Sequence, residues 1–168
     1  AVAGDLKTRG NRREFPADDF ELAGDGTTVT VLSRGGIGLE IFDIVSGERI
    51  GQIDTPAGVQ YWDLKIDPDG KLAALISLVA RRVDVIDMET GELRKTLELR
   101  APIASQFSPD SGVLAITGGD SLIRLYDTDD FVERRPLAGT SGMPGWVFFA
   151  PDGSRVVSAT AGEVRTWD

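Results

Sequence analysis

Residues 61–70, YWDLKIDPDG, decide how this chain folds. Apolar residues alternate with polar ones up to Ile66, which indicates a β-strand, and the Asp-Pro-Asp-Gly sequence that follows is typical of a tight turn. The turn recurs as FSPDSG at 107–112 and FAPDGS at 149–154, with a weaker copy, LAGDGT, at 22–27. Because this turn sequence recurs about every 42 residues, the sequence predicts a repeat protein.

A second periodic feature confirms the repeat length. The strings GLEIFD, RVDVID, LIRLYD and EVRTWD end at Asp43, Asp87, Asp127 and Asp168. The runs between these marks are short, rich in β-branched residues and bounded by Gly and Asp, and none carries a helical apolar stripe. We therefore expect one all-β unit over residues 1–168, with four repeats of four antiparallel strands. Residues 12–15 and 131–137 are among the strands expected.

These residues resemble WD-repeat β-propellers. The resemblance rests on TWD at 166–168, LYD at 125–127, the SPDSG and APDGS turns and the stretch 61–70, and it covers nearly the whole chain. It implies blades of four strands, and in each repeat the strands are read along the chain as d, a, b and c. The Gly-His pair of that family is missing because the chain has no His. Residues 82–99 are equally similar to lactonase-like and quinoprotein-like propellers.

Four repeats leave the complete assembly open. Propellers have roughly four to eight blades. The chain is therefore expected to be a partial propeller within a longer chain, a four-bladed ring, or half of an eight-bladed homodimer. The order of strands, from a d-like strand at 12–15 to a c strand that ends at Asp168, suits closure of a ring.

The resemblance also implies where partners bind. In such propellers the d–a and b–c loops gather on one face, which most often meets partners, and aromatic and Arg side chains there favour tight contacts. Trp62 and Trp146 could instead pack between blades, and Arg81 and Arg82 could be solvated or paired with Asp. Changing both of these arginines to Glu is expected to abolish binding without lowering the melting temperature. The candidate partner-binding residues are Arg34, Tyr61, Trp62, Arg81, Arg82, Asp120, Met143 and Trp146.

Composition excludes several function classes. Without His or Cys, the chain has no Ser-His-Asp or Cys-His catalytic site and no ordinary zinc, haem or iron–sulfur site. We expect no cofactor and no metal. A net charge of −9 disfavours nucleic acid and anionic membranes as partners. No apolar run reaches the length of a transmembrane helix, and AVAGDLKTRG lacks the apolar centre of a signal peptide. A soluble, bacterial and cytoplasmic protein is expected.

Two functions fit this pattern. The first is a non-catalytic scaffold that binds a protein partner through the d–a and b–c loop face. The alternative is a propeller enzyme of lactonase-like or quinoprotein-like type, in which carboxylates near the axis perform acid–base chemistry. Several carboxylates with perturbed pKa values at one end of the axis would favour the enzyme.

Overall fold

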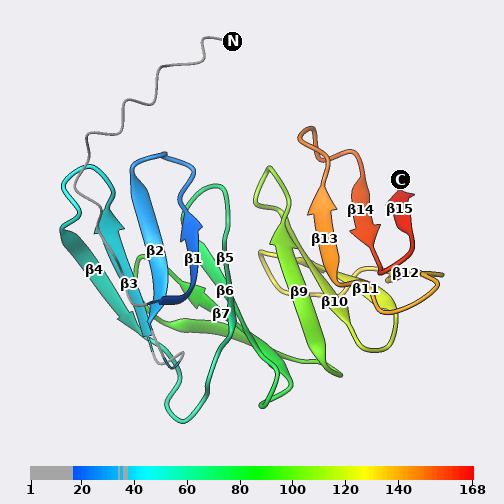
Figure 1. The fold of residues 1–168 in the computed structure, drawn as a ribbon, viewed down its shortest axis with the longest axis horizontal. Coiled ribbons are helices and arrows are strands. Elements are labelled where there is room, and N and C mark those ends of the chain that lie inside the picture. The colour runs from blue at the N-terminus through cyan, green and yellow to red at the C-terminus, as the bar shows by residue number, and fades with distance from the viewer. Residues whose placement is uncertain (1–16, 34, 36–37) are drawn as a thin grey trace.

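Four antiparallel sheets form the described part of the chain. The computed structural model describes residues 17–33, 35 and 38–168, and Figure 1 shows strands and turns throughout them. The first sheet contains β1 (Ala17–Leu22), β2 (Thr28–Ser33), β3 (Gly38–Asp43) and β4 (Arg49–Asp54). The second contains β5 (Asp63–Ile66), β6 (Leu72–Ser77), β7 (Arg82–Asp87) and β8 (Leu93–Glu98).

The last two sheets repeat this plan. The third contains β9 (Pro102–Phe107), β10 (Val113–Gly118), β11 (Leu122–Asp127) and β12 (Leu137–Ala138). The fourth contains β13 (Trp146–Phe149), β14 (Val156–Ala159) and β15 (Val164–Trp167). In every sheet the strands lie side by side in chain order, as a, b, c and, in the first three sheets, d.

The periodic residues form the turns between these strands. In the a–b turn of the second sheet, the carboxylate of Asp67 accepts hydrogen bonds from the backbone N–H groups of Lys71 and Leu72, at 2.7 and 2.8 Å. In the c–d turn, Asp87 accepts from the N–H groups of Glu89 and Thr90, at 3.0 and 2.9 Å. The repeat is therefore visible in the sequence because each turn needs an acceptor at the same place.

The hydrophobic core lies between consecutive sheets. One cluster joins the first sheet to the second and includes Leu39 and Leu64. A second cluster joins the second sheet to the third and includes Val83 and Phe107, and a third, around Ile123, joins the third sheet to the fourth. Each inner sheet is thus buried on both faces, which explains why β6 is buried along its whole length and apolar up to Ile76.

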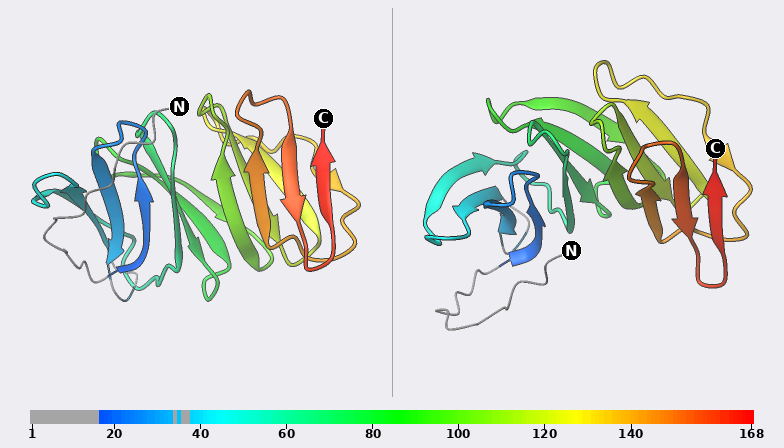
Figure 2. Two further views of the ribbon diagram at one scale, coloured as in Figure 1. Left: turned by 45° about the horizontal axis from the view of Figure 1, so that its top comes forward. Right: turned by 90° about the horizontal axis from the view of Figure 1, so that it is seen from above.

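The sheets follow one another along an open arc. Contacts join the first strands of consecutive sheets, β1 with β5, β5 with β9 and β9 with β13, so these strands line the inside of the arc. Figure 2 shows the first and fourth sheets at opposite ends. The expected alternative of a closed four-bladed ring within one chain is therefore wrong for this structure, because the first and last sheets do not come together.

The strand expected over 131–137 differs from the structure. A strand was predicted over 131–137, but the edge of the third sheet has only a bridge between Tyr126 and Glu133 and the two residues of β12. Phe131 adopts a positive φ of 59°, and Pro136 has no N–H to donate, so a continuous ladder cannot form here. The predicted strand at 12–15 lies outside the described residues.

Candidate functional site

An exposed apolar surface lies where the d–a loop reaches the second sheet and the b–c loop leaves it. The side chains of Trp62, Leu78 and Val79 are 44, 47 and 85% exposed. They line a shallow pocket together with Asp18, Gln60 and the buried Tyr61. We call Trp62, Leu78 and Val79 the Trp62 surface. Its backbone is anchored, because the N–H of Trp62 donates to the carbonyl of Ile76 in β6, at 3.0 Å.

Tyr61 does not belong to this surface. Its side chain is 1% exposed, and its hydroxyl donates a hydrogen bond to the carboxylate of Asp84, which is fully buried. Burial and this hydrogen bond raise the pKa of Tyr61. Thr96 also donates to Asp84, at 2.6 Å. The expectation that Tyr61 contacts a partner is corrected, since the side chain supports the core between the first two sheets.

Arg82 is the cation that balances Asp84. Its Nε and a terminal nitrogen each lie 2.8 Å from the Asp84 carboxylate. Of the two roles considered for the arginines, pairing with a neighbouring Asp therefore holds for Arg82. Arg81 is exposed and has a positive φ of 55° in the b–c turn, next to the Trp62 surface in sequence. Arg34 lies outside the described residues.

The remaining candidates lie near the junction of the third and fourth sheets. Asp120 holds Arg124 through two hydrogen bonds of 2.6 and 3.1 Å, and this arginine lowers the pKa of the carboxyl. Met143 is 60% exposed and lies beside Gly119. Trp146 is 57% exposed at the start of β13. The structure thus divides the candidates between two places instead of joining them in one cluster.

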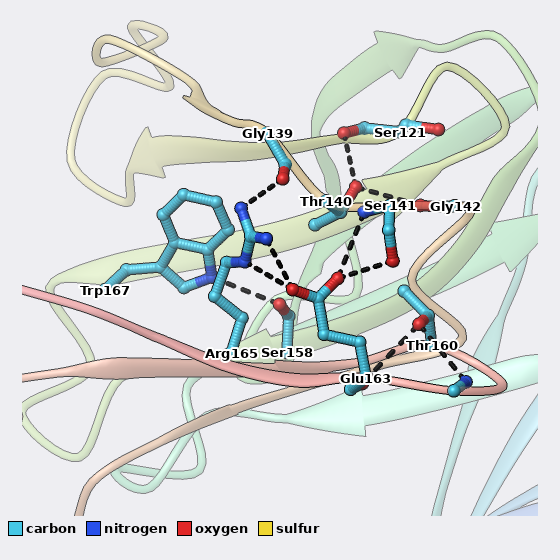
Figure 3. Close-up of polar contacts among 11 residues, drawn as sticks. Ser121, Gly139, Thr140, Ser141, Gly142, Ser158, Thr160, Glu163, Arg165 and Trp167 are labelled. Atoms are coloured by element: carbon cyan, nitrogen blue, oxygen red, sulfur yellow. Dashed lines mark hydrogen bonds and ion pairs between the residues drawn. The ribbon is translucent and has the colours of Figure 1, made fainter.

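A polar network fixes the loop that leads into the fourth sheet. Figure 3 shows the Glu163 carboxylate between Arg165 and Ser141. It accepts from the Ser141 hydroxyl at 2.5 Å and from the Arg165 Nε at 2.9 Å, and these bonds lower its pKa to about 2. Thr140 donates to the carbonyl of Ser121 at 2.9 Å, which ties this loop to the third sheet. The network holds the loop in one conformation.

Acidic side chains also meet on the first strands inside the arc. Asp19 accepts from the N–H of Leu64 at 2.9 Å, and Glu21 pairs with Lys65 at 2.8 Å. Beside them, one buried oxygen of Asp63 has no hydrogen-bond partner, and burial raises the pKa of this carboxyl to about 6. Several carboxylates with perturbed pKa values at one place would favour the enzyme alternative, and in this group only Asp63 has a raised pKa.

Sequence reasoning missed Leu78 and Val79. The run LAALISL at 72–78 has the pattern of a single buried strand, but β6 ends at Ser77. Ser77 accepts a hydrogen bond from the N–H of Ala80 at 3.1 Å, which begins the turn. A usable signal was present, because two large apolar residues followed by Ala and two Arg cannot all continue a buried strand.

Stacked antiparallel sheets, three with four strands and the last with three among the described residues, lie on an arc with their first strands inside, and this arrangement defines the blades of a β-propeller. The all-β propeller fold predicted from the sequence is confirmed.

No protein-family model matches the chain. An uncharacterized WD repeat-containing protein of Synechocystis is 29% identical over 128 residues, which make up 74% of this chain and 36% of the relative. The suspected WD-like propeller is thus supported by sequence as well.

A solved structure has the same fold. A chain of Kuenenia stuttgartiensis hydrazine synthase superposes with a TM-score of 0.76 at 20% identity, over 98% of this chain and 49% of that one. This chain spans about a third of the curated relative and about half of the solved neighbour. One similar protein carries a WD-repeat name and the other is named as an enzyme, so the fold is compatible with either role. Among the residues described, none belongs to a helix long and apolar enough to cross a bilayer.

Proposed function

We propose that this chain is a non-catalytic scaffold that binds a protein partner at the Trp62 surface. The observation that carries this proposal is the grouping of three exposed apolar side chains, Trp62, Leu78 and Val79, around one pocket. An aromatic side chain of this kind provides a large contact area and loses little conformational entropy on binding. The neighbouring Arg81 adds a cation at the rim, suited to a carboxylate of the partner.

The backbone beneath this surface supports the proposal. The b–c turn joins β6 and β7, whose apolar side chains are buried in the core, and its exit is held by a hydrogen bond from the N–H of Leu99 to the carbonyl of Arg81, at 2.9 Å. A loop that is already ordered loses little entropy when a partner binds. Little of the free energy gained by contacts at Val79 is therefore lost to ordering of the loop.

The test combines cross-linking with a measured affinity. A photo-cross-linking amino acid is placed at position 79, and in a matched control at Val45, which is 82% exposed in a c–d turn at the other end of the sheets. The protein captured at position 79 alone is then purified. We expect Trp62→Ala and Val79→Asp each to raise its Kd at least about tenfold, whereas Val45→Asp leaves it unchanged. Equal capture at both positions, or an unchanged Kd, would overturn the proposal.

The enzyme alternative rests on a different residue. Asp63 is a largely buried carboxyl on the inside of the arc with a pKa raised to about 6, which suits a general acid or base near neutral pH. If the chain hydrolyses lactones, Asp63→Asn should abolish turnover of a lactone panel while Trp62→Ala preserves it. Turnover that is absent, or is equal in both variants, would count against this alternative.

A further inference from the structure

The two ends of the arc expose side chains that correspond to the buried contacts between sheets. We propose that these ends bind the opposite ends of a second copy of this chain, so that two copies close one ring of eight sheets. The ends are distinct from the Trp62 surface, so this inference does not depend on the proposed function and is tested separately.

The fourth sheet exposes a residue whose counterparts in the other three sheets are buried. Leu39, Val83 and Ile123 each lie four positions before the aspartate of their own repeat, and each is 0% exposed because the next sheet covers it. Val164 has the same position in the fourth repeat and is 72% exposed. The strand register places Ala159 opposite Val164 and Trp146 opposite Ala159. One face of this sheet is therefore apolar and uncovered.

Two aromatic side chains enlarge this end. Trp146 and Phe148 alternate on β13 with the buried Val147, and they are 57 and 52% exposed. An apolar surface of this kind is typical of an interaction site. In the part of the chain that the structure describes, β15 also pairs on one side only, so its outer edge is open to a further strand.

The first sheet carries the complementary half. Phe20 on β1 corresponds in register to Leu64 of the second sheet and Val147 of the fourth, which are 0 and 2% exposed, whereas Phe20 is 60% exposed. Leu22 is 58% exposed, although the corresponding Ile66 is 7% exposed. The missing neighbour of the first sheet is therefore a sheet whose exposed face carries an apolar residue at the position of Val164, four residues before the aspartate of its repeat. We call such a residue Val164-type, and a residue at the position of Phe20 Phe20-type.

Contacts inside the chain show how the two ends would fit. The Val164-type residue Leu39 packs in the same cluster as the Phe20-type residue Leu64. Ile123 likewise packs in the same cluster as Val147. One chain thus carries both halves of this contact, but its own ends lie apart (Figure 2). A second copy supplies both missing halves at once, and two-fold symmetry makes the two junctions identical.

Sedimentation velocity of the 168-residue chain tests the proposal first. We expect a mass of twice 18.0 kDa. Val164→Asp and Phe20→Asp each place a charge in both junctions and should raise the dimer Kd at least about tenfold. The matched control is Val45→Asp, because Val45 is an exposed apolar residue in a c–d turn and not on β1 or the fourth sheet. A monomeric wild-type chain, or an open polymer, would overturn the proposal.

Mixing the two variants tests the head-to-tail geometry. A Phe20→Asp chain retains Val164, and a Val164→Asp chain retains Phe20, so the mixture contains one unaltered junction and should form a heterodimer where each variant alone is monomeric. Failure of the mixture to associate would overturn this geometry.

Because the chain has no Cys, cysteine cross-linking can also test the geometry without a destabilising charge. Phe20→Cys mixed with Val164→Cys should cross-link between copies, and Val45→Cys mixed with Val164→Cys should not; the reverse result would overturn it.

Discussion

The hydroxyl of Tyr61 donates a hydrogen bond to the fully buried carboxylate of Asp84, and Arg82 supplies the positive charge beside it. A buried charge is tolerated when it is paired and its oxygens are hydrogen-bonded. This relationship links the loop before β5 to β7, the c strand of the second sheet, and it assigns the two neighbouring arginines different roles.

Removing the cation of this group should therefore lower stability. We expect Arg82→Ala to reduce the free energy of unfolding by about 2–3 kcal/mol, because it leaves Asp84 charged and unpaired in the core. Arg81→Ala, at an exposed position, should change it by less than about 0.5 kcal/mol. Urea denaturation of both variants measures the difference, and equal effects would contradict the assignment. The double change to Glu should consequently lower the melting temperature, contrary to the expectation from sequence.

Asp63 should make stability depend on pH. Its pKa is raised to about 6 from 3.8, so the native state holds a proton more tightly than the unfolded state does. The contribution to stability is therefore full below about pH 4 and is lost as pH rises through 6. Asp63→Asn should abolish this fall and stabilise the chain at pH 7 by up to about 3 kcal/mol. Urea titrations from pH 4 to pH 7 test this, with the exposed Asp54→Asn as a control that should retain the wild-type slope.

Glu163 should have the opposite pH dependence. Hydrogen bonds from Ser141 and Arg165 lower its pKa to about 2 from 4.5, so its contribution to stability is present above pH 4.5 and is lost as pH falls through 2. The stability difference between wild type and Glu163→Gln should shrink over that interval. Ser141→Ala removes the largest cause and should move the Glu163 pKa upward in an NMR titration. A pKa that stays near 2 in that variant would show that Ser141 is not the main cause.

Gly70 should be needed for its conformation rather than for its size. It adopts a φ of 71° in the a–b turn, and a Cβ there would meet nothing within 4 Å. Gly70→Ala should therefore cost about 1–2 kcal/mol through backbone strain alone. Gly142 has equally open surroundings and no positive φ, so Gly142→Ala should be close to neutral. Thermal unfolding compares the two, and equal shifts would mean that strain at Gly70 is not the cause.

Local features of the fold could be predicted because they depend on short-range chemistry. Asp67 and Gly70 mark a turn in the sequence because one must accept backbone hydrogen bonds and the other must adopt a positive φ. The alternation of apolar residues likewise identified the strands that pack between sheets. Pro136 was a visible warning against a continuous strand at 131–137, but its effect depended on how the chain leaves β11.

The candidate site could be predicted less well because exposure is decided by neighbours in space. Tyr61 and Trp62 are adjacent aromatics, yet one lies in the core and the other at the surface, since successive side chains of an extended chain point to opposite sides. Arg81 and Arg82 separate for another reason, since Arg81 lies in the b–c turn with a φ of 55° and Arg82 begins β7. Nothing local distinguishes the members of either pair.

The sequence by itself determined the repeat, the strand order and the turns, since each follows from residues close together in the chain. Only the tertiary structure decided that the sheets form an open arc and that Val164 is exposed where Val83 is buried. The two valines belong to the same kind of strand. They differ because burial depends on whether another sheet lies against them, and that neighbour is set by packing at long range rather than by local sequence.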